Sequence, residues 1–461
     1  MVNFLSGAIA LLSAVTLVAG EAVTFDIARK HSPSAKQAAT AAKKRATALT
    51  KQTHAGNSLW AGHAPPTLSL QNAQYSYYMN ITLGTPPQDF TMVLDTGSAV
   101  LWVADSACSP SVCVDALHYF DSSASSTYTR IANNTLEAYY GLGNATGYLG
   151  TDTLTFGNGA VKITKQEFGQ ATAQAYITDN GDDGIIGFGP DIATTWADEL
   201  QTVIDTPLTN FVAQNPSYSK VFGIKFAPVP TGEVFAQNGL LTFGGLPDKS
   251  WYSGSLHWVP RAETYPLNYF WSVNVEKVEF GHVEIKQYNG TALSAIVDTG
   301  TTLILVDNSI FNPMYNSTKG STIDADTGLW SVPCSSVKSL PNLSFVLNGK
   351  AFTLKPSQYM LPQWLDTTWG ATSSDLCLSY VLGDSLAANG YDMILGQKFL
   401  ENFVAAYDAV NNKVGFAPVS HSSATKTTTK AGKKTKSKAP SQKTTTAKKS
   451  HQTNTHKSHK H

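Results

Sequence analysis

The sequence is poor in residue types and motifs that would point to several common classes of enzyme. Only 4 of its 461 residues are cysteines, and charged residues make up 14% of the chain. It contains no HExxH zinc motif, no CxxC pair, no GxSxG serine motif and no P-loop. These absences leave no sequence evidence for a zinc peptidase, a dithiol redox enzyme, a serine hydrolase of that type or a nucleotide hydrolase. We therefore expect neither a metal nor a cofactor.

Basic residues are scarce in the middle of the chain, although the formal net charge is +0. Residues 1–69 hold seven Lys or Arg and two acids, and residues 420–461 hold eleven Lys and no acid. Residues 70–419 keep 15 basic and 31 acidic residues, a net charge of −16. An acidic body disfavours nucleic-acid binding. It also loses self-repulsion as its carboxylates protonate, which suits an activity at low pH.

Two short stretches place an acid after an apolar run and before Thr-Gly. Asp95 follows residues 90–94, and Asp298 follows residues 293–297. Burying a carboxylate costs free energy unless it is hydrogen-bonded, and a glycine permits the tight turn that supplies the bonds. Two carboxylates within hydrogen-bond reach share one proton, so one accepts a proton from water while the other donates to a carbonyl oxygen. The pair predicts acid–base hydrolysis by Asp95 and Asp298.

An apolar-apolar-Gly step follows each acid about ninety residues later, ending at Gly187 and Gly396, which makes a weak internal repeat. Leu101-Trp102-Val103, the Tyr140-Gly141 hairpin and the closing run 393–418 complete the pattern. Over roughly residues 70 to 419 the sequence resembles the pepsin-like aspartic endopeptidases of peptidase family A1, in particular secreted fungal members. The resemblance implies a mostly β, bilobal fold with the active-site cleft between two β lobes.

The resemblance also divides the chain into five segments. These are a signal peptide (1–20), a propeptide (21–69, its end open), an N-terminal lobe with the first Asp and the flap (70–250), a C-terminal lobe with the second Asp (251–419) and a disordered tail (420–461). Alternation over residues 77–83 predicts a strand, closed by a turn at Gly84-Thr85-Pro86-Pro87. Helical signals are few: one helix starts at Thr206-Pro207, and two others cover 307–315 and 398–403.

The resemblance implies supporting roles around the two acids. The following residues orient the carboxylates and join their loops: Thr96, Gly97, Ser98, Thr299, Gly300 and Thr301. Tyr140 matches the flap tyrosine that bonds toward Trp102, and Gly141 lets a backbone amide reach the substrate. Leu142 departs from the family, which usually has a small hydroxyl residue there. The sequon at Asn144 lies near the flap tip, where a glycan could slow closure.

Four cysteines in a chain with an export signal favour disulfides, and they allow three connectivities. The resemblance implies the pairs Cys108–Cys113 and Cys334–Cys377; four free, buried thiols are the alternative. Asn-x-Ser/Thr sequons predict glycosylation of at least some sites on a secreted body. The sequons are Asn80, Asn133, Asn144, Asn289, Asn316 and Asn342.

The N-terminal segment begins with an uncharged apolar run over residues 4–19. Its length and small-residue end are typical of a signal peptide and short for a membrane span; an uncleaved anchor is the alternative. Residues 21–69 are basic and poor in large apolar residues, so they could lie across an acidic cleft and leave when its carboxylates protonate. A disordered linker is the alternative. Lys44-Arg45 suits dibasic processing, and the mature chain would begin between Ala46 and about Gln71.

The tail is built from Lys, Thr, Ser and His, with no large apolar residue, so it cannot form a core. It is either a solvated, O-glycosylated extension or an attachment to an anionic polymer such as a cell wall. A further interpretation of the protein is a wall-binding structural protein led by this tail, and unchanged localisation and activity after deletion of residues 420–461 would leave that interpretation without support.

We predict a secreted, monomeric zymogen of an aspartic endopeptidase that cleaves proteins at acid pH. Its partners are protein or peptide substrates, its own propeptide as inhibitor and pepstatin-type inhibitors, with no nucleic acid and no membrane span. The alternative is a catalytically inactive pepsin-like binding or inhibitor protein. Loss of either acid or of the flap tyrosine would favour that alternative, and this chain keeps Asp95, Asp298 and Tyr140.

Overall fold

The computed structural model describes residues 65–420, except 110–112, 114–115, 141–142, 176–181, 199–202, 289–290, 367 and 372. The predicted signal peptide, nearly all of the predicted propeptide and the tail after Ser420 lie outside the described residues. The described chain is mostly β, as predicted from the sequence.

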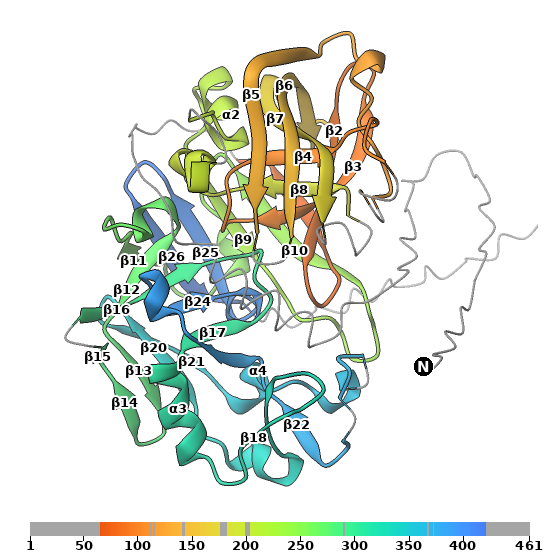
Figure 1. The fold of residues 1–461 in the computed structure, drawn as a ribbon. Coiled ribbons are helices and arrows are strands. Elements are labelled where there is room, and N and C mark those ends of the chain that lie inside the picture. The colour runs from red at the N-terminus through yellow and green to blue at the C-terminus, as the bar shows by residue number, and fades with distance from the viewer. Residues whose placement is uncertain are drawn as a thin grey trace, which may run out of the picture. The chain divides into compact units, whose positions relative to one another are not determined.

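Thirteen strands of the described chain form one large sheet, which draws on both halves of the sequence (Figure 1). Three strands of the C-terminal half extend the strands of the N-terminal half, so the sheet is shared by both halves; they are β11 (His257–Pro260), β26 (Lys413–Pro418) and β25 (Phe403–Asp408). The lobe bounds 70–250 and 251–419 stay a prediction. In spatial order the strands are β11 (His257–Pro260), β26 (Lys413–Pro418), β25 (Phe403–Asp408), β9 (Val221–Lys225), β10 (Ala236–Phe243), β1 (Thr67–Asn72), β2 (Tyr77–Leu83), β3 (Gln88–Asp95), β8 (Gly184–Gly187), β4 (Leu101–Ala104), β7 (Val161–Ala175), β6 (Asn144–Phe156) and β5 (Thr129–Tyr139).

Three smaller sheets belong to the C-terminal half. The first contains β12 (Ser272–Val275), β16 (Thr291–Val297), β24 (Met393–Leu395), β17 (Ile304–Asp307) and β23 (Val381–Asp384), with β15 (Gln287–Tyr288) beside β16. The second contains β14 (Val283–Ile285), β13 (Lys277–Phe280), β20 (Leu343–Leu347) and β21 (Lys350–Leu354). The third contains β18 (Thr322–Ile323), β19 (Trp330–Pro333) and β22 (Leu376–Leu378).

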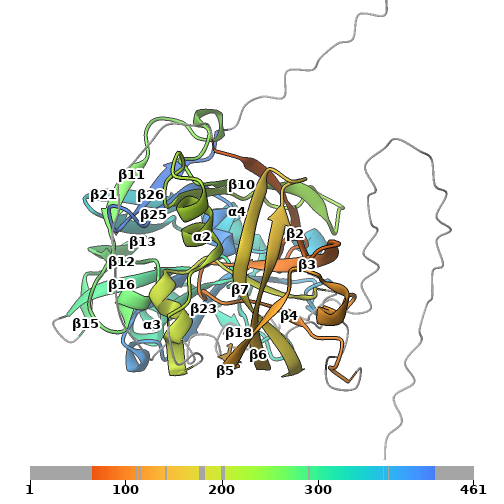
Figure 2. The same ribbon diagram turned by 90° about the horizontal axis from the view of Figure 1, so that it is seen from above.

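Helices in the described part of the chain are short, and none is long and apolar enough to cross a membrane. Figure 2 shows α2 lying beside β7, where the Gln214 side chain donates a hydrogen bond to the Thr164 carbonyl at 2.9 Å. The α-helices are α2 (Pro207–Gln214), α3 (Asn308–Ser317), α4 (Pro356–Tyr359) and α5 (Gln397–Leu400). The 3₁₀ helices are Ser122–Ala124, Asp191–Asp198, Lys249–Trp251, Leu267–Tyr269, Cys334–Ser339, Gln363–Leu365 and Ala387–Asn389.

Two of the predicted helices begin at the expected residues, and the third is shorter than predicted. α3 begins where predicted, because the Asp307 side chain accepts a hydrogen bond from the Ser309 N–H at 2.8 Å and caps the first turn. α2 begins at Pro207, but the Thr206 hydroxyl bonds to Asp191 instead of capping the helix. The prediction of a helix over 398–403 was too long. α5 ends at Leu400, because residues 403–408 are all buried and pair as β25 with two neighbouring strands.

The alternating pattern of β2 builds one wall of the core. Met79, Ile81 and Leu83 are buried, while Asn80 is exposed. Each fully buried side chain of this type stabilises the fold by about 1.5–3 kcal/mol. Gly84 then takes a φ of +94°, which a side chain would strain, and turns the chain into β3.

The internal repeat of the sequence corresponds to a repeated strand arrangement. In the first half, β8 lies between β3, to which it runs parallel, and β4, to which it runs antiparallel. In the second half, β24 lies in the same way between β16 and β17. Figure 1 shows the first trio in the upper part of the view and the second in the lower part. Each trio places an aspartate at the end of its first strand.

Candidate active site

The first acid ends β3 and is held by the turn that follows it. Asp95 is fully buried. The N–H of Gly97 donates to Asp95 Oδ1 at 2.8 Å, and the hydroxyl of Ser98 donates to Asp95 Oδ2 at 2.5 Å. Both carboxylate oxygens therefore have fixed donors, which compensates for their removal from water.

The second acid has the same arrangement. Asp298 directly follows β16 and is fully buried. The N–H of Gly300 donates to Asp298 Oδ1 at 2.9 Å, and the hydroxyl of Thr301 donates to Asp298 Oδ2 at 2.5 Å. We call residues 95–98 and 298–301 the first and second aspartate loops.

Four crossed hydrogen bonds join the two aspartate loops. The N–H of Thr96 donates to Thr299 Oγ1, and the N–H of Thr299 donates to Thr96 Oγ1, both at 2.9 Å. The same hydroxyls donate onward, Thr96 to the Val297 carbonyl and Thr299 to the Leu94 carbonyl, again at 2.9 Å. Both threonines are fully buried. Because each hydroxyl uses a donor and an acceptor, the bonds fix the two loops to one another.

The glycine of each apolar-apolar-Gly step lets the backbone approach the loop region closely. A Cβ on Gly187 would overlap the backbone of Ala99, just after the first loop. A Cβ on Gly396 would overlap the carbonyl oxygens of Thr301 and Leu303, at the second loop. These steps therefore need glycine because there is no room for a side chain.

The predicted flap tyrosine contacts the predicted tryptophan. Tyr140 follows β5, and its hydroxyl accepts a hydrogen bond from Trp102 Nε1 at 2.6 Å. Its N–H donates to the Gly143 carbonyl at 3.0 Å, which helps close the turn between β5 and β6. Gly141 and Leu142 lie outside the described residues, so the expectations for them stay predictions.

The structure contains two disulfides, in the pairing that the resemblance implies. Cys108 and Cys113 are bridged with an S–S distance of 1.94 Å, and Cys334 and Cys377 with one of 2.10 Å. The first bridge follows β4 in sequence, and the second ties the start of the 3₁₀ helix Cys334–Ser339, just after β19, to β22.

The described sequon asparagines lie at accessible positions. Asn80, Asn316 and Asn342 are exposed and Asn144 is half-buried at the start of β6. Asn289 lies outside the described residues, as does the side chain of Asn133. Glycosylation at all six stays a prediction.

Sequence patterns did not single out two buried aspartates that hold the strands leading to the loops. Asp183 Oδ2 accepts the N–H of Thr91 in β3 at 2.8 Å and lies 2.9 Å from Nδ1 of His118. Its Oδ1 accepts the N–H groups of Leu117 at 2.8 Å and His118 at 2.7 Å. Asp183 therefore ties the loop around residue 118 to the strand that ends at the first acid.

Asp392 is the counterpart of Asp183, four residues before the second glycine step. Its Oδ2 accepts the N–H of Ser294 in β16 at 2.8 Å and the hydroxyl of Ser294 at 3.1 Å. Burial raises the pKa of Asp392 above its ordinary value, the Ser294 hydrogen bonds oppose the rise, and the charge of Asp307 adds to it. An Asp in a loop usually indicates a solvated charge, so only the spacing of four residues from each glycine could have marked the pair.

Two further residues behind the loops were not predicted. Gln397 is fully buried, and its Nε2 donates to the Thr299 carbonyl at 2.6 Å. Tyr407 on β25 is fully buried and stacks on Phe222 with ring centroids 4.5 Å apart. Burial raises the pKa of Tyr407 well above its ordinary value, with a smaller rise from the nearby charge of Asp298.

Among the described residues, no group of three or more His, Cys, Asp or Glu side chains is placed to hold a metal ion. The residues that the structure brings together at the ends of β3 and β16 are carboxylates, hydroxyls and backbone amides. This set can hold, accept and donate protons.

Comparisons with known proteins agree with this geometry. A family model described as "Eukaryotic aspartyl protease" matches residues 76–419. The chain is 31% identical to polyporopepsin of Irpex lacteus over 369 residues, covering 79% of this chain and 99% of the relative. It is 31% identical to mouse gastricsin over 346 residues, covering 74% and 81%. The crystal structure of the aspartic proteinase from Irpex lacteus superposes with a TM-score of 0.67 at 30% identity, covering 78% of this chain and 99% of that one.

Proposed function

Because the chain belongs to the family of eukaryotic aspartyl proteases and is an aspartic-type endopeptidase, we propose that Asp95 and Asp298 form the dyad that activates the attacking water. The observation that carries the proposal is the set of crossed hydrogen bonds between Thr96 and Thr299. They join two loops that each present a buried carboxylate with the same two donors.

The proposed chemistry needs only the proton that the two acids share. In the singly protonated dyad, the ionised acid accepts a proton from water as the water attacks the peptide carbonyl. The protonated acid donates to the carbonyl oxygen, which gives a neutral gem-diol. The acids then exchange roles: one takes a proton from the gem-diol and the other protonates the leaving amine. Gly97, Ser98, Gly300 and Thr301 keep the carboxylates in place through both steps.

We also propose that the protein is made as a secreted zymogen. The apolar run over residues 4–19 supports export, and two disulfides suit an oxidising compartment. The basic segment 21–69 is the proposed inhibitor of an acidic body, and the basic tail from 420 is either a solvated, O-glycosylated extension or a contact to an anionic polymer. The flap residues Tyr140, Gly141 and Leu142 are proposed to close over protein substrates.

The test uses enzyme secreted from the full chain, with unfolded protein as substrate at about pH 3 to 5, near the range in which free carboxyls titrate. We expect cleavage that pepstatin blocks and that falls by about 10⁴-fold in Asp95→Asn and in Asp298→Asn. Thermal unfolding of each variant shows whether it has folded. Full activity in either folded variant would refute the dyad. Sequencing the N-terminus before and after acidification tests the zymogen, because we expect a new terminus between Ala46 and about Gln71.

A further inference from the structure

Lys398 of α5 and Glu401, the residue just after this helix, form a buried ion pair that the proposed chemistry does not use. Nζ of Lys398 lies 2.7 Å from Oε1 of Glu401, and the two side chains are only 4% and 6% exposed. Lys and Glu are almost never buried to this extent unless they are paired. Removing two charges from water costs several kcal/mol per ion, so such a pair is weak evidence of stabilisation by itself.

One side of α5 holds the second aspartate loop through its carbonyl groups. Gln397 donates twice, from Nε2 to the Thr299 carbonyl at 2.6 Å and from its N–H to the Thr301 carbonyl at 2.8 Å. The N–H of Lys398 donates to the Thr302 carbonyl at 3.1 Å. The positions of three carbonyl groups just after Asp298 therefore depend on the position of the first turn of α5.

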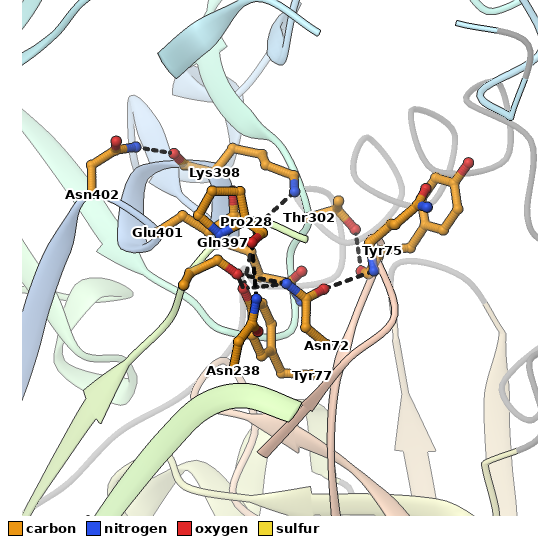
Figure 3. Close-up of polar contacts among 12 residues, drawn as sticks. Asn72, Tyr75, Tyr77, Pro228, Asn238, Thr302, Gln397, Lys398, Glu401 and Asn402 are labelled. Carbon is orange, nitrogen blue, oxygen red and sulfur yellow. Dashed lines mark hydrogen bonds and ion pairs between the residues drawn. The ribbon is translucent and has the colours of Figure 1, made fainter. Parts of the chain in front are cut away.

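The other side of α5 reaches the first half of the chain. Oε1 of Glu401 lies 3.3 Å from the hydroxyl of Tyr77, the first residue of β2. That hydroxyl shares its hydrogen between Glu401 Oε1 and the Ala227 carbonyl, which lies 2.7 Å away, and it accepts from Nδ2 of Asn72 at 2.8 Å. Figure 3 shows Asn72 and Tyr77 next to the turn of α5. β2 pairs along its length with β3, the strand that ends at Asp95.

A second link joins the same two regions. The hydroxyl of Thr302 donates to the Tyr75 carbonyl at 2.6 Å, and Tyr75 lies in the turn between β1 and β2 (Figure 3). The residue after the second aspartate loop is thus fixed both to α5 and to the turn that precedes β2. The ion pair lies where these contacts meet.

We infer that the Lys398–Glu401 pair is a positioning device. It fixes α5, through which Gln397 holds the second aspartate loop, against the Asn72–Tyr77 turn of the first half, and so sets the spacing of the two acids. This inference rests on the proposed dyad. Lys398, Glu401 and Gln397 are positioning residues, because they act through the loop and not on the substrate.

The test replaces both charges by apolar side chains of similar size, in the double variant Lys398→Met with Glu401→Leu. Replacing both partners of a buried pair is often neutral for stability, whereas removing one leaves a buried, unpaired charge. The double variant therefore separates positioning from folding. The matched control makes the same substitutions at the exposed pair Lys286–Glu284, whose atoms lie 2.8 Å apart.

We expect kcat of the double variant to fall by about tenfold with KM within about twofold, because a small misplacement of reacting groups affects the chemical step. The bell-shaped pH profile of kcat should also narrow, since carboxylates that move apart interact less and titrate closer together. The groups that face Glu401 are Lys398 on α5, Tyr77 on β2 and Tyr380 before β23. Burial raises the pKa of Tyr77 and of Tyr380 well above the ordinary value of a tyrosine.

A folded double variant with wild-type kcat and pH profile would overturn the inference. If the double variant does not fold, Gln397→Glu tests the same arrangement, because it leaves the ion pair and replaces the donor to Thr299 by an oxygen. Unchanged kcat in that variant would overturn the inference equally. Asp298→Asn in the same series keeps the two proposals distinguishable. If it retains activity, the dyad fails and this inference with it; if it loses activity while the double variant does not, only the positioning role fails.

Discussion

The first and second aspartate loops have the same hydrogen bonds inside them and different side chains around them. After the glycine step, the first half continues with Phe188, which packs on Phe222 with ring centroids 5.2 Å apart. The second half continues with Gln397, which donates to the Thr299 carbonyl. In β4, Trp102 lies opposite Ile185; in the same register of β17, Leu305 lies opposite Ile394. The two halves are therefore alike where they hold the carboxylates, and they differ where each half contacts its own surroundings.

Removing either of the two threonine hydroxyls that join the loops tests most directly whether the two loops are equivalent. We expect Thr96→Val and Thr299→Val each to lower the free energy of unfolding by about 2–4 kcal/mol, because each leaves a buried N–H and a buried carbonyl without a partner. The two losses should agree within about 1 kcal/mol, as the contacts are equivalent. Urea unfolding measures both.

Thr67→Val, at an exposed position, is the control for the threonine pair and should change stability by less than about 0.5 kcal/mol. If the two variants lost clearly different amounts of unfolding free energy, the contacts of Thr96 and Thr299 would not be equivalent, and one loop would depend on the other.

A second test compares Asp183→Asn with Asp392→Asn, in an Asp95→Asn background that prevents self-digestion. Asp183 has three backbone donors and His118, so we expect its variant to lose about 2 kcal/mol of unfolding free energy at pH 7. In the described part of the chain, the Asp392 carboxylate accepts hydrogen bonds from Ser294 alone, and burial raises the pKa of Asp392. Thermal unfolding at pH 3 and pH 7 measures the difference.

The direction in which Asp392 changes stability with pH follows from its raised pKa. The fold favours the neutral acid, so the wild type carries no penalty below the ordinary carboxyl range and loses stability as the pH rises above it. Asparagine cannot ionise, so the Tm of Asp392→Asn relative to wild type should be higher at pH 7 than at pH 3. An equal difference at the two pH values would show that ionisation of Asp392 does not limit stability.

The sequence allowed the repeated part to be predicted, because two Asp-Thr-Gly motifs are each followed by a glycine step at a similar spacing, 92 residues in the first half and 98 in the second. The strand over residues 77–83 and the start of α3 followed from alternation and from the Asp307 cap in the same local way. The side chains that surround the loops could not be predicted from the sequence in this way. Lys398 and Glu401 resemble solvent-exposed helix charges, and only the path of β25 and β2 around them explains their burial.

The smallest expected effect concerns Tyr140, whose contact partner Trp102 has Leu305 as its counterpart in the second half. Tyr140→Phe removes the acceptor for Trp102 Nε1–H and leaves a buried donor unpaired, at a cost of about 1 kcal/mol. If the contact orients the flap over the substrate, that cost falls on catalysis, and kcat/KM drops by about three- to tenfold while Tm changes little. Tyr139→Phe is the control, because this neighbouring side chain is 45% exposed. Equal activity in the two variants, measured on one peptide substrate, would mean that the bond to Trp102 serves packing alone and that the first half has no catalytic element of its own at this position.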